Sequence, residues 1–128
     1  MSNVPENLYY TEDHEWILVE GDTATIGITD FAQSSLGNIV FVELPESEAV
    51  FDNGDSFGVV ESIKSVSDLY TPLAGKVLER NEEVEESPEK LNENPFASWL
   101  VKIKMSQPDQ IESLMSAEKY KSFCENIS

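Results

Sequence analysis

Residues 58–77 have the sequence GVVESIKSVSDLYTPLAGKV. Two runs rich in valine and aromatic residues, 57–61 and 66–70, have the composition of β-strands. The short polar segment Ser62–Ser65 lies between them, and residues 72–75, Pro-Leu-Ala-Gly, turn the chain into a further strand at 76–79. The pattern therefore predicts a β-hairpin with Lys64 at its tip.

The chain before this hairpin also has the patterns of β-structure. Residues 15–20 and 23–28 flank Gly21-Asp22, a favourable two-residue hairpin turn. Ala24, Ile26 and Ile28 share one face, which is the two-residue period of a half-buried strand. The run at 39–42 is apolar on both faces and predicts a buried strand, and a turn is expected at 52–55.

Short helices are expected at two places. Asp30 is a suitable N-cap, Gln33 follows three residues later, and Gly37 can close the helix. Ser87-Pro88 is typical of the start of one helical turn, because proline favours the first helical position. The acidic stretch 82–86 between these regions is interpreted as a solvated loop.

The end of the chain combines a strand with helix. Residues 99–104 alternate between apolar and polar side chains, which predicts a last strand with one wet face. Beyond it, Ser106 and Ser116 are suitable helix starts, and apolar residues follow the spacing of an amphipathic helix. We expect this tail to clamp the sheet, with Cys124 as a small packed apolar residue.

Composition excludes several function classes. The 128 residues suit one domain, and their net charge of −17 disfavours binding to nucleic acid or to anionic membranes. One cysteine and one histidine, His14, leave no disulfide and no Cys- or His-based metal cluster. No leader pattern or membrane-length apolar run is visible, so a cytoplasmic protein is expected, or a mitochondrial matrix protein if this is a processed eukaryotic form.

Residue chemistry alone does not make Lys64 special. An exposed lysine amine is mostly protonated at neutral pH and is a poor nucleophile. Schiff-base catalysis requires a buried lysine instead. With Glu61 before it and Asp68 after it, Lys64 suits recognition by a modifying enzyme, but an ordinary surface lysine has the same appearance.

A family resemblance changes this interpretation. Residues 61–68, E-S-I-K-S-V-S-D, resemble the E-S-V-K-x-x-S-D segment of the glycine cleavage system H proteins. Four further blocks resemble the family in the same order: D-H-E-W at 13–16, A-T-I-G-I-T-D-F-A-Q at 24–33, L-G-N-I-V-F-V-E-L-P at 36–45 and W-L-V-K-I-K at 99–104. Asp13 replaces a usual serine, and Ser98 replaces a frequent glycine.

The resemblance implies a mainly β, hybrid barrel-sandwich fold of antiparallel strands with short helices and a C-terminal helical segment. Residues 1–128 would form a single lipoyl-carrier domain, with the sandwich over about 8–104 and the helical segment over about 107–127. The implied protein is not an enzyme. It carries lipoate on Lys64, with Glu61 and Asp68 as recognition residues.

The resemblance also implies partners and a role in glycine catabolism and one-carbon metabolism. The carrier would take the aminomethyl group of glycine from glycine decarboxylase (P protein) to the aminomethyltransferase (T protein). Dihydrolipoamide dehydrogenase (L protein) would reoxidise the dithiol, and a lipoate ligase or lipoyl transferase would attach the group. The protein itself is expected to be a monomer.

Other residues and readings stay open at this point. Glu15 is a candidate contact for an amine on the loaded arm, or else a surface carboxylate, and His14 is expected to be an ordinary strand-edge residue. Trp16 and Trp99 are expected in the core. The lipoyl domains of 2-oxoacid dehydrogenases often show D-K-A, and biotin carriers have methionines where Ile63 and Ser65 stand. An H-like protein that relays lipoyl groups to other enzymes is not excluded by the sequence.

Overall fold

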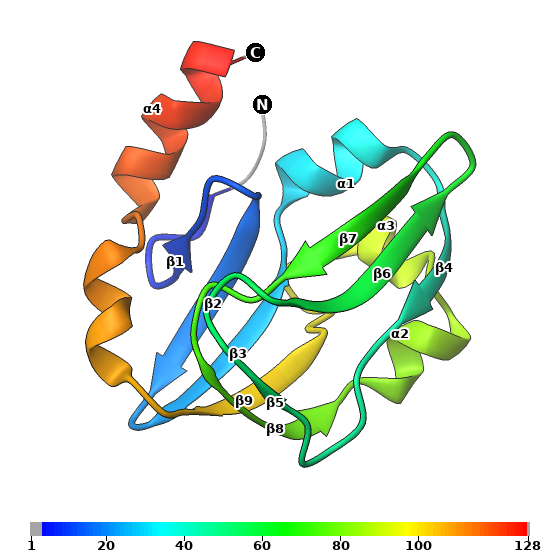
Figure 1. The fold of residues 1–128 in the computed structure, drawn as a ribbon. Helices are drawn as coiled ribbons and strands as arrows, with labels where there is room; N and C mark the ends of the chain where they lie inside the picture. The colour runs from blue at the N-terminus through cyan, green and yellow to red at the C-terminus, as the bar shows by residue number, and fades with distance from the viewer. Residues whose placement is uncertain (1–3, 128) are drawn as a thin grey trace.

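The structure, a computed structural model, describes residues 4–127 (Figure 1). Within this range the strands form two antiparallel sheets: six strands in the order β1-β2-β3-β9-β8-β5, and three in the order β4-β6-β7. The predicted class, mainly antiparallel β with short helices and a C-terminal helix, is confirmed. The elements in chain order are β1 (Tyr9–Tyr10), β2 (Glu15–Glu20), β3 (Thr23–Ile28), α1 (Asp30–Leu36), β4 (Ile39–Glu43), β5 (Val50–Phe51), β6 (Ser56–Ser62), β7 (Val66–Tyr70), β8 (Gly75–Arg80), α2 (Glu82–Glu86), α3 (Lys90–Glu93), β9 (Val101–Met105), η1 (Pro108–Ser113) and α4 (Ala117–Ile127).

The hairpins predicted from the sequence are present. β2 pairs with β3 in register from Glu15 opposite Ile28 to Glu20 opposite Thr23, and Gly21 in the turn has the positive φ of 62° that glycine tolerates. β6 pairs with β7 around the tip at residues 62–65. The tip projects beside the segment between α1 and β4, on the side of the molecule away from α4 (Figure 1).

Strand β3 is buried on both faces, so the expectation of a half-buried strand was wrong. Ala24, Ile26 and Ile28 face the main core between the sheets, as predicted. On the other face, Gly27 lies under the indole of Trp16, where a Cβ atom would overlap the ring. A second apolar cluster covers this face; its buried members are Val4, Leu8, Tyr10, Trp16, Ala117 and Tyr120.

The prediction that residues 39–42 form a buried strand was wrong, because strand β4 is partly exposed. It is an edge strand of the three-stranded sheet, and its pairing with β6 is irregular between Ile39 and Phe41. Because this β-bulge changes the alternation, two consecutive side chains point outward. Val40 is 55% exposed and Phe41 is 44% exposed.

The short helices differ in detail from the predictions. Helix α1 is capped by Thr29, whose Oγ1 accepts a hydrogen bond from Ala32 N, so Asp30 is the first helical residue and not the cap. The predicted closure at Gly37 is confirmed. The stretch 82–86 is helix α2 and not a loop, because Asn81 caps it and Val84 is fully buried. Helix α3 begins at Lys90, after a turn at the predicted start.

The last third of the chain follows its predictions closely. Strand β9 begins two residues later than predicted, and its Val101 and Ile103 side chains are buried.

Trp16 is in the core as expected, whereas Trp99 is half-buried with the Lys102 amine 4.8 Å from its ring centre. Helix α4 packs on β1 through the stacked rings of Tyr10 and Tyr120, and Cys124 packs at the edge of the second cluster. The two-residue strands β1 and β5 were not predicted.

Candidate functional site

The hairpin tip is a tight turn organised by Ser62. The backbone N–H of Ser62 donates to Ser65 O (2.8 Å), and the Ser62 hydroxyl oxygen lies 3.3 and 3.2 Å from the N–H groups of Lys64 and Ser65. The Ser62 side chain is buried, whereas Ile63 is 71% exposed and Lys64 is exposed. The turn therefore presents the lysine to solvent. Serine before the tip was a signal for this turn that the sequence analysis did not use.

The hairpin tip contacts the segment that joins α1 to β4. Ile63 N donates to Asn38 O at 3.0 Å. A Cβ atom on Gly37 would lie 3.5 Å from Lys64 Cε and 3.8 Å from its Nζ, so the lysine side chain extends over this glycine. Gly37 has φ +81°, a conformation that favours glycine. The site is thus open at the amine and supported at its base.

The two acidic residues of the lysine motif share the outer face of the three-stranded sheet. Glu61 pairs with Val66, and Val59 pairs with Asp68. Since residues 59 and 61 alternate onto the same face, Glu61 and Asp68 lie diagonally across the hairpin on one side. The structure therefore brings the predicted recognition residues together next to the tip.

Glu15 lies elsewhere and is not the surface carboxylate that one reading of the sequence allowed. It is 2% exposed at the start of β2. Its Oε1 accepts a hydrogen bond from Thr11 Oγ1 (3.2 Å), and the backbone N–H of Tyr70 also bonds its carboxyl. Burial, and then the negative charge of Asp13, raise the Glu15 pKa to about 8 against the opposing effect of these donors. The group is therefore mostly protonated at neutral pH.

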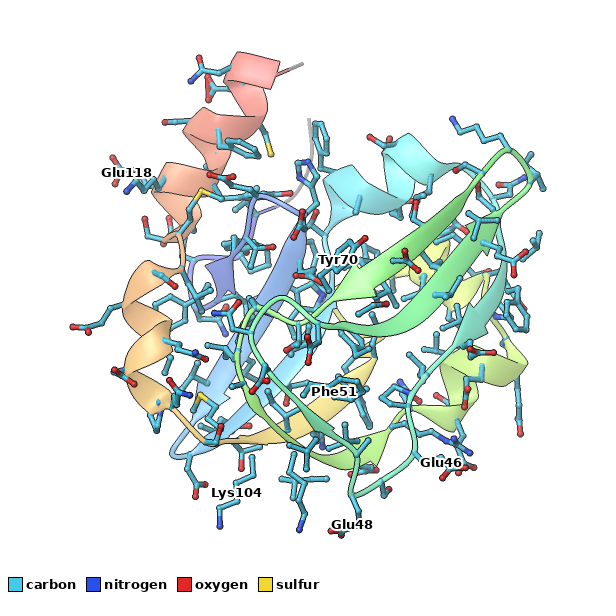
Figure 2. The ribbon with its side chains drawn as sticks, in the orientation of Figure 1. Glu46, Glu48, Phe51, Tyr70, Lys104 and Glu118 are labelled. Carbon is cyan, nitrogen blue, oxygen red and sulfur yellow. The ribbon has the colours of Figure 1, made fainter. Side chains whose placement is uncertain are left out.

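An open cleft of about 240 Å³ lies at the end of β7 opposite the hairpin tip, and its lining includes Thr11 and Tyr70, the two residues that donate to the Glu15 carboxyl. Figure 2 shows Tyr70 where β7 ends near β2. Four residue steps along β7 separate the two ends by roughly 13 Å at the usual strand rise, so Glu15 and Lys64 are not in contact. The cleft is lined by Tyr10, Thr11, Glu12, Asp13, Asn53, Gly54, Tyr70, Thr71, Pro72, Ser113, Leu114 and Met115.

His14 belongs to a network of hydrogen bonds and stacked rings that the sequence analysis missed. It is a turn residue with φ 63°, and not the strand-edge histidine expected. Its Nδ1 lies 2.8 Å from the Tyr120 hydroxyl, which lies 2.7 Å from Thr29 Oγ1, and its ring stacks on Phe31 with ring centres 4.4 Å apart. Burial lowers the His14 pKa, against the effect of the Asp13 charge. The network joins α4, the cap of α1 and the turn before Glu15.

The described residues contain neither a metal-binding cluster nor a membrane-spanning helix. Among residues 4–127, no group of three or more histidine, cysteine, aspartate or glutamate side chains is arranged to hold a metal ion. Over the same residues, no helix has the length and apolar character needed to cross a membrane.

Comparisons with known proteins agree with the fold and the sequence motifs. Residues 8–127 match the family described as Glycine cleavage H-protein. The glycine cleavage system H protein of Halothermothrix orenii is 56% identical over 126 residues, 98% of each chain. That of Staphylococcus saprophyticus is 58% identical over 118 residues, 91% of this chain and 94% of the relative.

A solved structure supports the same conclusion. The crystal structure of a glycine cleavage system H protein from Mycobacterium marinum superposes with a TM-score of 0.88 at 35% identity, covering 95% of this chain and 99% of that one. Both sequence and fold therefore match along nearly the whole length. The chain belongs to the glycine cleavage H-protein family, the non-catalytic lipoyl carriers of the glycine cleavage system.

Proposed function

We propose that Lys64 is the lysine that carries the lipoyl group, and that the chain moves the aminomethyl group of glycine between the enzymes of the glycine cleavage system. The observation that carries this proposal is the exposed Lys64 amine at the end of a hairpin whose turn is held by Ser62. An amide bond to lipoate needs a primary amine that another enzyme can reach, and the tip meets that requirement.

The surroundings of Lys64 fit such a group. Gly37 next to the lysine carries no side chain, so the space over the start of the arm stays open. Lipoate bound there supplies a disulfide that two-electron thiol–disulfide chemistry opens and recloses. The folded chain contributes a rigid base: the β6–β7 pairing and the Ile63–Asn38 hydrogen bond hold the tip in place.

Glu15 is proposed to bind the amine at the loaded end of the arm. The support is its buried carboxyl, to which Thr11 and Tyr70 donate, and the open cleft that these two donors line. A protonated amine near this carboxyl would favour its ionised form, so Glu15 would release its proton to the solvent and pair with the ammonium.

The partners are proposed from the family role and the surface charge. They are glycine decarboxylase, the aminomethyltransferase, dihydrolipoamide dehydrogenase and a lipoate ligase or lipoyl transferase. The net charge of −17 favours fast, salt-sensitive encounter with partners whose docking surfaces are basic. Glu61 and Asp68 beside the tip are proposed as recognition residues for the attaching enzyme. A monomer and a cytoplasmic location remain predictions from the sequence.

Lipoylation with purified ligase tests the central proposal. The wild-type chain is expected to gain one lipoyl group, mapped to Lys64 by peptide mass spectrometry, and then to support glycine–bicarbonate exchange with the decarboxylase. Lys64→Arg keeps the charge but cannot form the amide, so it should lose both properties. Lys76→Arg is the matched control, because Lys76 lies on β8 and pairs with Glu48 at 2.6 Å. A lipoyl group mapped to Lys76 would refute the assignment.

A further inference from the structure

Asn92 makes contacts that neither the lipoyl role nor the core explains. It lies on α3, half-buried, beside the end of α1. Within the described chain its side-chain amide makes three hydrogen bonds. Oδ1 accepts from Ile39 N at 2.8 Å, and Nδ2 donates to Gly37 O at 2.7 Å and to Gln33 Oε1 at 3.0 Å. One side chain thus joins α1, its C-terminal cap and the first residue of β4.

The segment that Asn92 holds is the support of the hairpin tip. Asn38, between the two backbone groups that Asn92 binds, accepts the hydrogen bond from Ile63 N (3.0 Å). Gly37 faces the Lys64 side chain. Asn92 is therefore linked to the acceptor lysine through residues 37–39 and Ile63, although it lies 28 positions later in the sequence.

Residues 37–39 need contacts from another element to keep one conformation. Glycine has a wider range of backbone conformations than any other residue, and Gly37 lies where the helix ends and the chain changes direction. The Gly37 N–H closes α1 on Gln33 O, and the Asn92 amide fixes the carbonyl on the other side of the same residue. Both sides of Gly37 are then held, and Asn38 O keeps its direction toward the hairpin.

Helix α3 itself does not depend on these contacts alone. Leu91 is fully buried, and Ser98 Oγ donates to Lys90 O at 3.0 Å. Replacement of Asn92 is therefore expected to leave α3 in place and to loosen mainly residues 37–39. The effect should be local and should reach Lys64 through the Ile63–Asn38 hydrogen bond.

We propose that Asn92 is a positioning residue for lipoylation: it fixes residues 37–39, which hold the hairpin tip in the form that the attaching enzyme binds. This inference rests on the proposed role of Lys64. An enzyme that binds only the ordered tip sees a lower effective concentration of substrate when the tip is loosened, so its KM for the carrier rises while kcat is unchanged.

The test compares wild type with Asn92→Ala and Asn92→Asp. Aspartate keeps the size and the acceptor for Ile39 N, but it places oxygen against Gly37 O and Gln33 Oε1. Asn94→Ala, an exposed position on the same segment, is the matched control. The measurements are lipoylation kinetics with purified ligase and hydrogen exchange of the Ile63 amide. The Leu100 amide, bonded to Ile26 O in the core, is the reference.

For both Asn92 variants we expect about a fivefold to tenfold rise in KM with unchanged kcat, and a rise in Ile63 exchange relative to Leu100, because hydrogen bonds that fix residues 37–39 are lost. Asn94→Ala should match wild type. Unchanged KM, or exchange that rises equally at Ile63 and Leu100, would overturn the inference, because the effect would then be absent or global. Wild type that gains no lipoyl group on Lys64 would instead refute the proposed function.

Discussion

Replacing Glu15 by glutamine should change how the stability of this protein depends on pH. The Glu15 pKa is about 8 in the folded chain, against an ordinary value of 4.5. Between these values the unfolded chain has lost the proton and the folded chain keeps it. The free energy of unfolding therefore falls by about 1.4 kcal/mol for each pH unit on account of this group. The contribution is fully present below about pH 4.5 and is lost as the pH rises toward 8.

The expected magnitude is large for one side chain. From about pH 5 to about pH 8 the wild type should lose about 3 to 4 kcal/mol through Glu15, whereas Glu15→Gln should lose none of it. Glutamine keeps an oxygen for the Thr11 hydroxyl and the Tyr70 N–H, so the local hydrogen bonds are retained. His14 acts in the opposite direction, since its lowered pKa costs stability as the pH falls below 6.5. Both proteins carry His14, so its effect largely cancels in the difference.

Urea denaturation of the two proteins across this pH range measures the difference. Glu20→Gln is the control, because Glu20 lies at the exposed end of the same strand. It should run parallel to wild type. If the curves of wild type and Glu15→Gln are also parallel, Glu15 ionises normally in the folded protein, and the argument for its buried, protonated state fails. The proposed binding of an amine at Glu15 would lose its electrostatic basis as well.

Three further predictions follow from single contacts. Glu61→Gln should slow lipoylation severalfold without lowering the melting temperature, since exposed or half-exposed charges contribute about 0 to 1 kcal/mol to folding; an unchanged rate would make Glu61 ordinary surface. Tyr120→Phe removes a hydroxyl with hydrogen bonds on both sides and should cost about 1 to 3 kcal/mol in urea unfolding, whereas Tyr9→Phe at an exposed ring should cost almost nothing. Gly27→Ala should destabilise the chain by about 1 to 3 kcal/mol and alter the near-UV signal of Trp16, because the new methyl group overlaps the indole; an unchanged spectrum and stability would contradict the packing.

The local patterns of the sequence predicted much of the fold. The alternation in residues 15–28 and 57–70 gave the β2–β3 and β6–β7 hairpins with their turns, because strand periodicity and turn chemistry act over a few neighbouring residues. The same reasoning placed Lys64 at a tip. Its role came from the family resemblance, since an exposed lysine has no local signature of modification.

Other elements were misjudged because their environment is distant in sequence. The charges of residues 82–86 suggested solvent, but buried Val84 and the Asn81 cap make a helix. The apolar run at 39–42 suggested burial, but β4 is an edge strand with a bulge that turns Val40 and Phe41 outward. The pattern of side chains indicates which secondary structure a segment favours, whereas the strands and helices packed against it decide how exposed it is.

The same distinction separates Lys64 from the residues around it. Local sequence was enough to predict an exposed amine at the end of a hairpin, because every group needed for that turn lies within a few positions. Packing between distant segments is what buries Glu15 against Tyr70, brings His14 to Tyr120 and places Asn92 on residues 37–39. These contacts join residues from 53 to 106 positions apart, and their chemistry depends on desolvation and geometry that exist only once the sheets and helices have packed.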